Sequence, residues 1–160
     1  MTPPPIEQRK PEHFLSREQV KRRRKSGGIL LNYGLILAGG VGQRMRSSGM
    51  PKQFLEVFGK PIIIYTLEKF EKCEDIDKIV ICCNASWIEY MNSLINQYRI
   101  SKILEVVLGG KNRQESIRNG IIRISKEGGP DDDIVVIHDG VRPLVQNVII
   151  SENIRIAKKY

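Results

Sequence analysis

Long apolar stretches are absent from this sequence of 160 residues, and cysteines are few. No apolar run approaches the roughly 18 residues that a membrane-spanning helix needs, and the N-terminus lacks the apolar segment of a secretory signal peptide. The three cysteines, Cys73, Cys82 and Cys83, form no C-x-x-C pair, which argues against a disulfide framework and a zinc site. These absences predict a cytoplasmic protein with reduced cysteines and no membrane partner.

Basic residues are concentrated near the N-terminus. Residues 1–27 hold eight Lys or Arg against three Glu, so they contribute +5 of the net charge of +8. Three consecutive prolines and few apolar residues predict that residues 1–28 form a disordered basic tail. The run from Lys21 to Lys25 is typical of an import signal or a nucleic-acid-binding patch, but no aromatic side chain interleaves with it to stack on bases. We therefore expect no nucleic-acid partner and interpret the tail as an appendage.

Beyond the tail, short apolar runs alternate with segments of helical period. The runs are rich in Ile and Val and predict strands at residues 34–38, 78–83, 103–108 and 133–138. Adjacent residues of a strand point to opposite faces, so Cys82 and Cys83 should lie on opposite sides of the sheet.

Three helices are predicted between these strands. Pro61 is suited to open the first helix, and Ser86 with Glu89 forms a capping-box pattern at the start of the second. The third should run over residues 112–126, with Ile117, Ile121 and Ile124 facing inward. Strand and helix in alternation predict an α/β fold, in which helices cover both faces of a mainly parallel sheet.

The predicted strands share small or polar residues at their carboxyl ends. These ends read Ala38-Gly39-Gly40, Asn84, Gly109-Gly110 and His138-Asp139-Gly140. In an open parallel sheet such ends lie along one edge, where ligands bind in a crevice. Residues far apart in the sequence are therefore predicted to converge on one cleft.

The sequence LAGGVGQRM begins with the last two residues of the first predicted strand, and its glycines follow that strand directly. Gly39, Gly40 and Gly42 allow a sharp turn that brings backbone N–H groups close to an anion. Arg44 and Lys52 add two positive charges beside that turn. Together these groups predict a holder for a polyphosphate, and the alternative is a glycine turn with exposed basic residues.

Two common phosphate-binding loops are excluded. A dinucleotide-binding fingerprint requires a third glycine where this chain has Met45. A Walker loop fails in EVVLGGKN, where Glu105 replaces the first glycine and Asn112 replaces the hydroxyl residue. A nucleotide would therefore be held in another way.

Asp139 ends the fourth predicted strand on the same edge. A lone carboxylate beside phosphates is repulsive unless a divalent cation lies between them, and Mg²⁺ uses one or two carboxylates together with substrate phosphates. The alternative is an aspartate that caps a turn.

Several motifs, in the order in which they follow one another along the chain, resemble those of a known family. LAGGVGQRM, then PKQF and GKPIIIYTLEKF, resemble the opening of sugar nucleotidyltransferases. The later GGKNRQESIRNG and HDGVRPLV resemble the IspD/TarI family of polyol-phosphate cytidylyltransferases over about residues 33 to 160. The resemblance implies a Rossmann-like, three-layer nucleotidyltransferase (GT-A-like) fold that would be incomplete at the C-terminus. Residues 29–160 would be the N-terminal, nucleotide-binding part of the enzyme domain.

The resemblance also implies a reaction and a set of residues for it. Such enzymes join CTP to a polyol phosphate and release pyrophosphate, with Mg²⁺ or another divalent cation as cofactor. Arg44 and Lys52 would hold the triphosphate as catalytic residues, Asp139 would bind the metal, and Arg142 would bind the acceptor substrate. The nucleotide-binding positions would be Ala38, Gly39, Gly40, Gly42, Gly110, Lys111 and Ser116.

Motifs of this family differ between enzymes that use different acceptor substrates. Among family members HDAARP is usual in enzymes for 2-C-methyl-D-erythritol 4-phosphate, and HDAVRPF in enzymes for D-ribitol 5-phosphate. Val141 in HDGVRPL, together with MPKQFLE and Trp87, resembles the ribitol group. Complete members continue past residue 160 and form homodimers. A non-catalytic nucleotide-binding fragment therefore stays open as an alternative.

Overall fold

The computed structural model describes residues 30–40, 49–127 and 133–159. The predicted tail at residues 1–28, and Gly42 and Arg44 of the glycine-rich turn, lie outside these described residues. The strands are β1 (Asn32–Ala38), β2 (Glu56–Val57), β3 (Lys60–Pro61), β4 (Lys78–Cys83), β5 (Ile103–Leu108) and β6 (Ile134–Asp139). The helices are η2 (Lys52–Phe54), α2 (Ile62–Lys72), η3 (Ala85–Trp87), α3 (Ile88–Gln97), α4 (Arg113–Ser125) and α5 (Asn147–Ala157).

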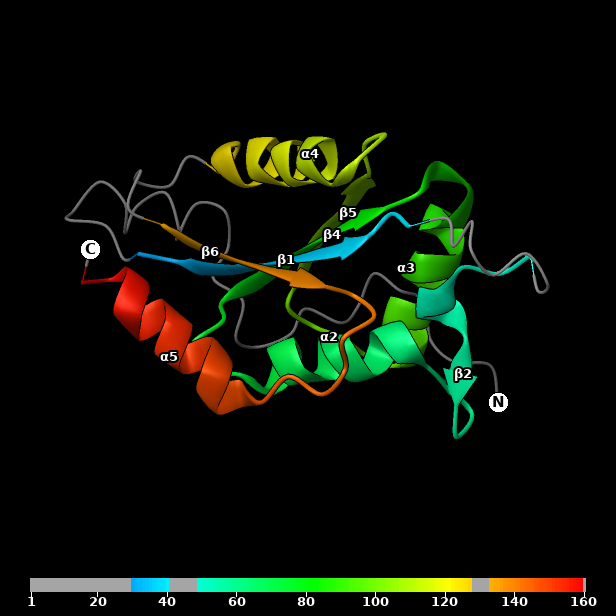
Figure 1. The fold of residues 1–160 in the computed structure, drawn as a ribbon, viewed down its shortest axis with the longest axis horizontal. Coiled ribbons are helices and arrows are strands. Elements are labelled where there is room, and N and C mark those ends of the chain that lie inside the picture. The colour runs from blue at the N-terminus through cyan, green and yellow to red at the C-terminus, as the bar shows by residue number, and fades with distance from the viewer. Residues whose placement is uncertain (1–29, 41–48, 128–132, 160) are drawn as a thin grey trace, which may run out of the picture.

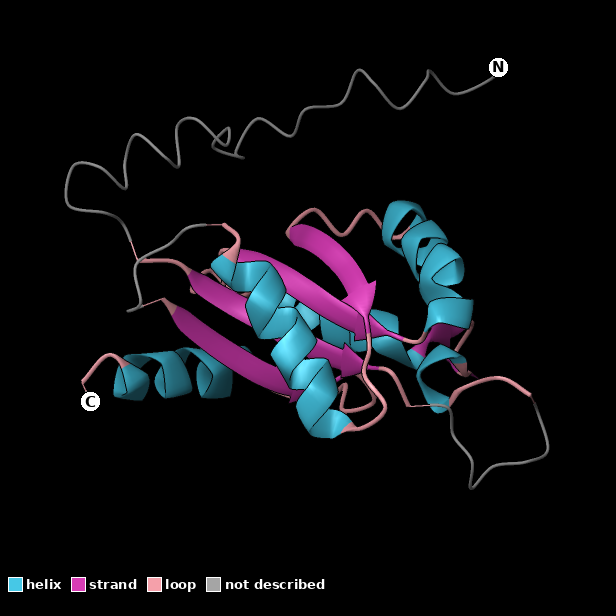
Figure 2. Cartoon of the chain, turned by 90° about the horizontal axis from the view of Figure 1, so that it is seen from above, coloured by secondary structure: helices cyan, strands magenta, loops and turns pink. Residues whose placement is uncertain are grey.

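Four strands form one parallel sheet in the order β5-β4-β1-β6. Helix α4 lies against one face of this sheet, and α2 and α5 lie against the other (Figure 1). Seen from above, α4 crosses the near face of the strands (Figure 2). The predicted three-layer α/β arrangement is therefore confirmed. Its physical reason is that the strands of a parallel sheet are apolar on both faces and need helices on both sides.

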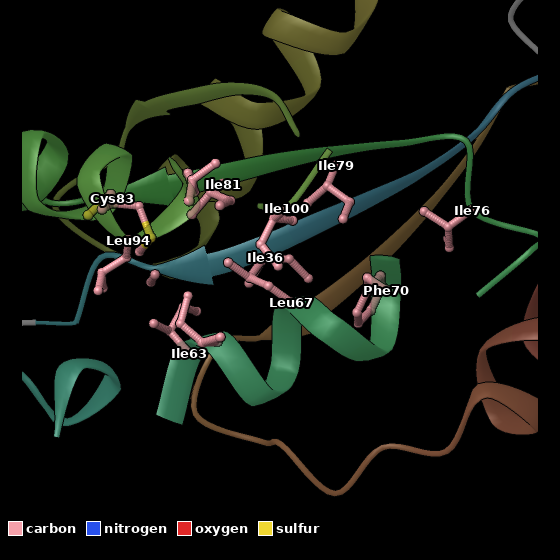
Figure 3. Close-up of a cluster of buried hydrophobic side chains, with 14 of the residues drawn as sticks. Ile36, Ile63, Leu67, Phe70, Ile76, Ile79, Ile81, Cys83, Leu94 and Ile100 are labelled. Atoms are coloured by element: carbon pink, nitrogen blue, oxygen red, sulfur yellow. The ribbon is translucent and has the colours of Figure 1, made fainter. Parts of the chain in front are cut away.

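Alternate residues of the central strands point to opposite faces of the sheet and belong to two separate hydrophobic clusters. Ile36, Ile79 and Ile81 face α2 and α3, where they meet Leu67 and Met91; Figure 3 shows the centre of this cluster. The opposite face holds Leu35, Val80 and Cys82, which pack under α4. Cys82 and Cys83 belong to different clusters, as predicted. Burial raises the pKa of both thiols to about 11, so they stay protonated near neutral pH.

Two details of the predicted helices are wrong. Ile121 was expected to face inward, but it is 41% exposed, because Gly120 occupies the position on α4 that approaches Leu35. The start of the second helix depends on Asn84, whose side chain accepts a hydrogen bond from the Ser86 N–H, rather than on a capping box from Ser86 to Glu89.

A short hairpin and a single turn of 3-10 helix connect β1 to α2, and neither was predicted. Strands β2 and β3 are antiparallel and only two residues long each, which is too short to show an alternating pattern. Within the residues that the structure describes, no helix combines the length and apolar character needed to cross a membrane.

Candidate active site

A cavity of about 440 Å³ opens at the carboxyl ends of the parallel strands. It is bounded by the end of β1, by η2, by the turn from β5 into α4 and by the end of β6. Its lining residues are Leu37, Ala38, Gly39, Gly40, Gln53, Gly110, Lys111, Asn112, Arg113, Ser116, Asp139 and Val141. The predicted convergence is therefore confirmed for the ends of β1, β5 and β6. Asn84, at the end of β4, is not among the lining residues, and its side chain caps η3 instead.

The backbone just after β1 leaves hydrogen-bond donors available at the cavity. Gly39 and Gly40 line it, and within the described residues neither N–H donates to a protein acceptor. Gly39 is half-buried and Gly40 is exposed, so a ligand can reach both amides. Successive N–H groups that are free at a cavity wall suit an anionic ligand.

The turn from β5 into α4 is closed by its own side chains. Ser116 Oγ accepts the Gly110 N–H at 2.9 Å and donates to the Asn112 carbonyl at 3.0 Å. Asn112 caps α4 by accepting the Glu115 N–H at 2.8 Å, and the Glu115 carboxylate accepts the Lys111 N–H at 2.9 Å. This turn therefore forms a rigid wall of the cavity before any ligand binds.

Glycine is required at position 110 for steric reasons. A Cβ added to Gly110 would lie 2.3 Å from Cβ of Glu115 and 2.7 Å from its backbone carbonyl carbon. Side chains at position 110 would therefore push the first turn of α4 away from β5.

Asp139 lies between two arginines at the end of β6. Arg113 donates to one carboxylate oxygen through Nη1, and Arg142 donates to the other through Nε at 2.9 Å. Burial alone would raise the pKa of Asp139, but the hydrogen bonds and charges of Arg113 and Arg142 outweigh it and hold the pKa below its usual value. The carboxylate is therefore ionised at neutral pH.

The surroundings of Asp139 fit a cation only in part. Among the described residues, no group of three or more His, Cys, Asp or Glu could hold a metal ion. One carboxylate, with both oxygens already in contact with arginines, cannot hold Mg²⁺ by itself. It fits a cation that takes most of its ligands from phosphates and water.

Two predicted residues lie outside the cavity wall. Lys52 is the first residue of η2, and its exposed side chain is not among those that line the cavity. The Arg142 side chain is 72% exposed and is not among the lining residues, but it pairs with Asp139, which is one of them. The predicted positions that do line it are Ala38, Gly39, Gly40, Gly110, Lys111, Ser116 and Asp139.

Gln53 is the main site residue that the sequence reasoning missed. Its side chain is buried beside the cavity and donates to the carbonyl oxygens of Ala38 and Gly40. In the sequence, the one feature that could have drawn attention to Gln53 is its position in PKQF, between a lysine and an apolar phenylalanine. Arg113 lines the cavity as well, and its contact with Asp139 across 26 positions cannot be inferred from local sequence.

The open parallel sheet and the cavity at its strand ends define a Rossmann-like α/β protein. A family model described as IspD, 2-C-methyl-D-erythritol 4-phosphate cytidylyltransferase, matches residues 33–160. The chain therefore belongs to the IspD family of cytidylyltransferases.

Individual relatives agree with this family, and a solved structure agrees with the fold. A ribitol-5-phosphate cytidylyltransferase of Vibrio parahaemolyticus is 49% identical over 130 residues, which are 81% of this chain and 54% of the relative. One of Streptococcus agalactiae is 45% identical with the same coverage. The crystal structure of 4-diphosphocytidyl-2C-methyl-D-erythritol synthase from Anaerococcus prevotii has a TM-score of 0.62 at 23% identity, covering 81% of this chain and 52% of that one. The chain spans about half the length of the curated relatives it matches.

Proposed function

We propose that this chain is the nucleotide-binding part of a cytidylyltransferase that transfers CMP from CTP to D-ribitol 5-phosphate. The observation that carries the proposal is the cavity itself, in a chain of this family. Its wall combines the free N–H groups of Gly39 and Gly40 with the guanidinium of Arg113. The two amides have no protein acceptor within the described residues, and Arg113 adds a positive charge beside them. This combination of free donors and positive charge suits a triphosphate.

In this reaction a phosphate oxygen of the acceptor attacks the α-phosphorus of CTP. A new P–O bond forms while the bond from the α-phosphorus to the bridging oxygen breaks, and pyrophosphate leaves with that electron pair. The products are CDP-ribitol and pyrophosphate. No covalent bond to the protein is required, so its contribution is positioning and charge stabilisation.

The residues of this chain would divide that work between them. The Gly39 and Gly40 amides would bind phosphate oxygens, and Lys52 and Arg44 would neutralise charge that grows on the α-phosphate and the leaving pyrophosphate. The turn at Gly110 and Ser116 would receive the cytosine base. Arg142 would reach the acceptor phosphate, since a planar guanidinium binds phosphate through two hydrogen bonds.

Asp139 would hold Mg²⁺ together with the phosphates of the nucleotide. The cation would supply charge neutralisation between the carboxylate and the phosphates. We also propose a cytoplasmic location, which the three free cysteines favour. The homodimer implied by the family resemblance stays a prediction for the complete protein.

The second candidate acceptor is 2-C-methyl-D-erythritol 4-phosphate. The description of the family model favours it, whereas the relatives at 45% and 49% identity carry the name of the ribitol enzyme. Val141 at the cavity wall also matches the residue usual in ribitol enzymes.

A pyrophosphate-release assay on the complete gene product tests this proposal. CTP and Mg²⁺ are offered with D-ribitol 5-phosphate and, separately, with 2-C-methyl-D-erythritol 4-phosphate. We expect release with ribitol phosphate and a much lower kcat/KM with the other acceptor. The reverse order would assign the second candidate. Binding of CTP without release from either acceptor would favour a non-catalytic nucleotide-binding protein.

A further inference from the structure

Gln53 connects two segments of the cavity that are distant in sequence. Its side-chain Nε2 donates to the carbonyl oxygen of Ala38 at 2.7 Å and to that of Gly40 at 3.1 Å. The residue is only 3% exposed although it lines the cavity. One amide group therefore fixes both ends of the short stretch that carries the free glycine amides.

The hydrogen bond to the Ala38 carbonyl also determines which way the Gly39 N–H points. In a trans peptide the C=O and the following N–H point in opposite directions. With the Ala38 carbonyl directed at Gln53, the N–H of Gly39 must point away from it. Carbonyl oxygens carry partial negative charge, so satisfying them with Nε2 also removes acceptors that would repel a phosphate.

The turn that carries Gln53 is stabilised by backbone hydrogen bonds and by the packing of Phe54. The Phe54 N–H donates to the Pro51 carbonyl at 3.0 Å, and the Leu55 N–H donates to the Lys52 carbonyl at 3.2 Å. Phe54 is fully buried and stacks on Trp87 with ring centroids 5.1 Å apart. Lys52 therefore lies within a closed backbone turn and directly precedes a residue that is anchored to the glycine stretch.

We propose that Gln53 is a positioning residue for the phosphates of the nucleotide. Its amide holds the backbone at residues 38–40 in place from both ends and directs the Gly39 N–H away from Gln53. It also keeps the turn that starts with Lys52 in register with that backbone. This inference rests on the proposed function, because it takes the anion at the cavity to be the triphosphate of CTP.

Two substitutions separate this role from simple packing. Gln53→Met keeps most of the side-chain volume but has no donor, and Gln53→Glu keeps the shape but presents a carboxylate to two carbonyl oxygens. Gln97, an exposed glutamine on α3, provides the matched controls Gln97→Met and Gln97→Glu.

The experiment uses the complete gene product and three readouts. The first readout compares the KM for CTP with the KM for the acceptor. The second is the dissociation constant of CTP, measured by calorimetry, and the third is hydrogen exchange of the amides at residues 38–40. We expect Gln53→Met to raise the KM and the dissociation constant for CTP about tenfold, with the KM for the acceptor unchanged. Gln53→Glu should raise both further, amide exchange should be faster in both variants, and the Gln97 variants should match the wild type.

Other outcomes would overturn the inference. Wild-type affinity for CTP in Gln53→Met would mean that Gln53 only fills space. Equal increases in both KM values, with unchanged exchange at residues 38–40, would mean a general structural defect. If the wild type binds CTP but releases no pyrophosphate, the proposed function fails while the CTP affinities and exchange rates still judge Gln53. If the wild type does not bind CTP, both fail.

Discussion

Charge and hydrogen-bonding capacity are distributed unevenly among the single residues of the cavity. Asp139 is already balanced by Arg113 and Arg142, whereas the Gly39 and Gly40 amides have no protein acceptor within the described residues. An incoming triphosphate could therefore bind the free amides without displacing any protein contact. At Asp139, by contrast, a cation would have to compete with two guanidinium groups. We infer that phosphate binding depends mainly on the glycine turn and nearby cations.

The first prediction concerns Lys52. If its ammonium group neutralises charge on the triphosphate, Lys52→Ala should lower the turnover of the complete enzyme by about a hundredfold or more. Steady-state pyrophosphate release measures this. Lys69→Ala, an exposed lysine on α2, serves as the control and should behave as the wild type. Near-wild-type turnover of Lys52→Ala would refute the proposed role.

The second prediction concerns Gly110. Because a Cβ there would lie 2.7 Å from a backbone carbon of Glu115, Gly110→Ala should displace the start of α4. We expect the free energy of unfolding to fall by about 1–3 kcal/mol and CTP binding to weaken. Gly40→Ala, where an added Cβ meets nothing within 4 Å, should leave the unfolding free energy unchanged. Equal unfolding free energies for Gly110→Ala and the wild type would contradict this steric argument.

At the scale of whole elements, an ion-pair network ties the C-terminal end of α4 to the sheet. Glu127 accepts from Lys78 Nζ on β4 at 3.0 Å and from Arg123 Nη1 on α4 at 2.9 Å. Arg123 also pairs with Glu105 on β5. Because α4 begins at the cavity wall, this network at its other end helps to fix that wall.

The third prediction follows from the pKa of Glu127. Burial alone would raise this pKa, but hydrogen bonds and charges from Arg123 and Lys78 lower it below the ordinary 4.5. A carboxyl whose pKa is lower in the folded state stabilises the fold above its unfolded pKa. That stabilisation disappears as the pH falls through the folded pKa.

Glu127→Gln should therefore cost about 2 kcal/mol of unfolding free energy at neutral pH, and the difference from the wild type should shrink at acidic pH. Chemical denaturation at several pH values measures this. Glu152→Gln is the control, because its pair with Arg155 is exposed to solvent and such pairs contribute little. A pH-independent difference would contradict the assignment.

The same scale explains how far the fold could be predicted. Strands β4 and β5 were predicted with the observed bounds, because Ile- and Val-rich runs with polar ends suit buried parallel strands. The hairpin of β2 and β3 could not be predicted from periodicity, since each strand has two residues. Ile121 was misplaced because the helical period alone did not reveal that Gly120 faces the sheet.

At the scale of the whole molecule, parallel topology brings the site together. The rule that strand ends share one edge correctly predicted that Ala38, Gly110 and Asp139 would meet. The contacts of Gln53 could not be predicted in this way, because its burial depends on how η2 packs against β1 and α3. The roles of Arg44 and Gly42 stay predictions, since both lie outside the described residues.

A crystal structure of the complete protein with CTP and Mg²⁺ tests the central claim most directly. We predict that the triphosphate lies in the cavity at the strand ends, with phosphate oxygens within hydrogen-bond distance of the Gly39 and Gly40 N–H groups and with Lys52 directed toward them. A triphosphate bound elsewhere, or Lys52 directed away from the bound nucleotide, would contradict the account.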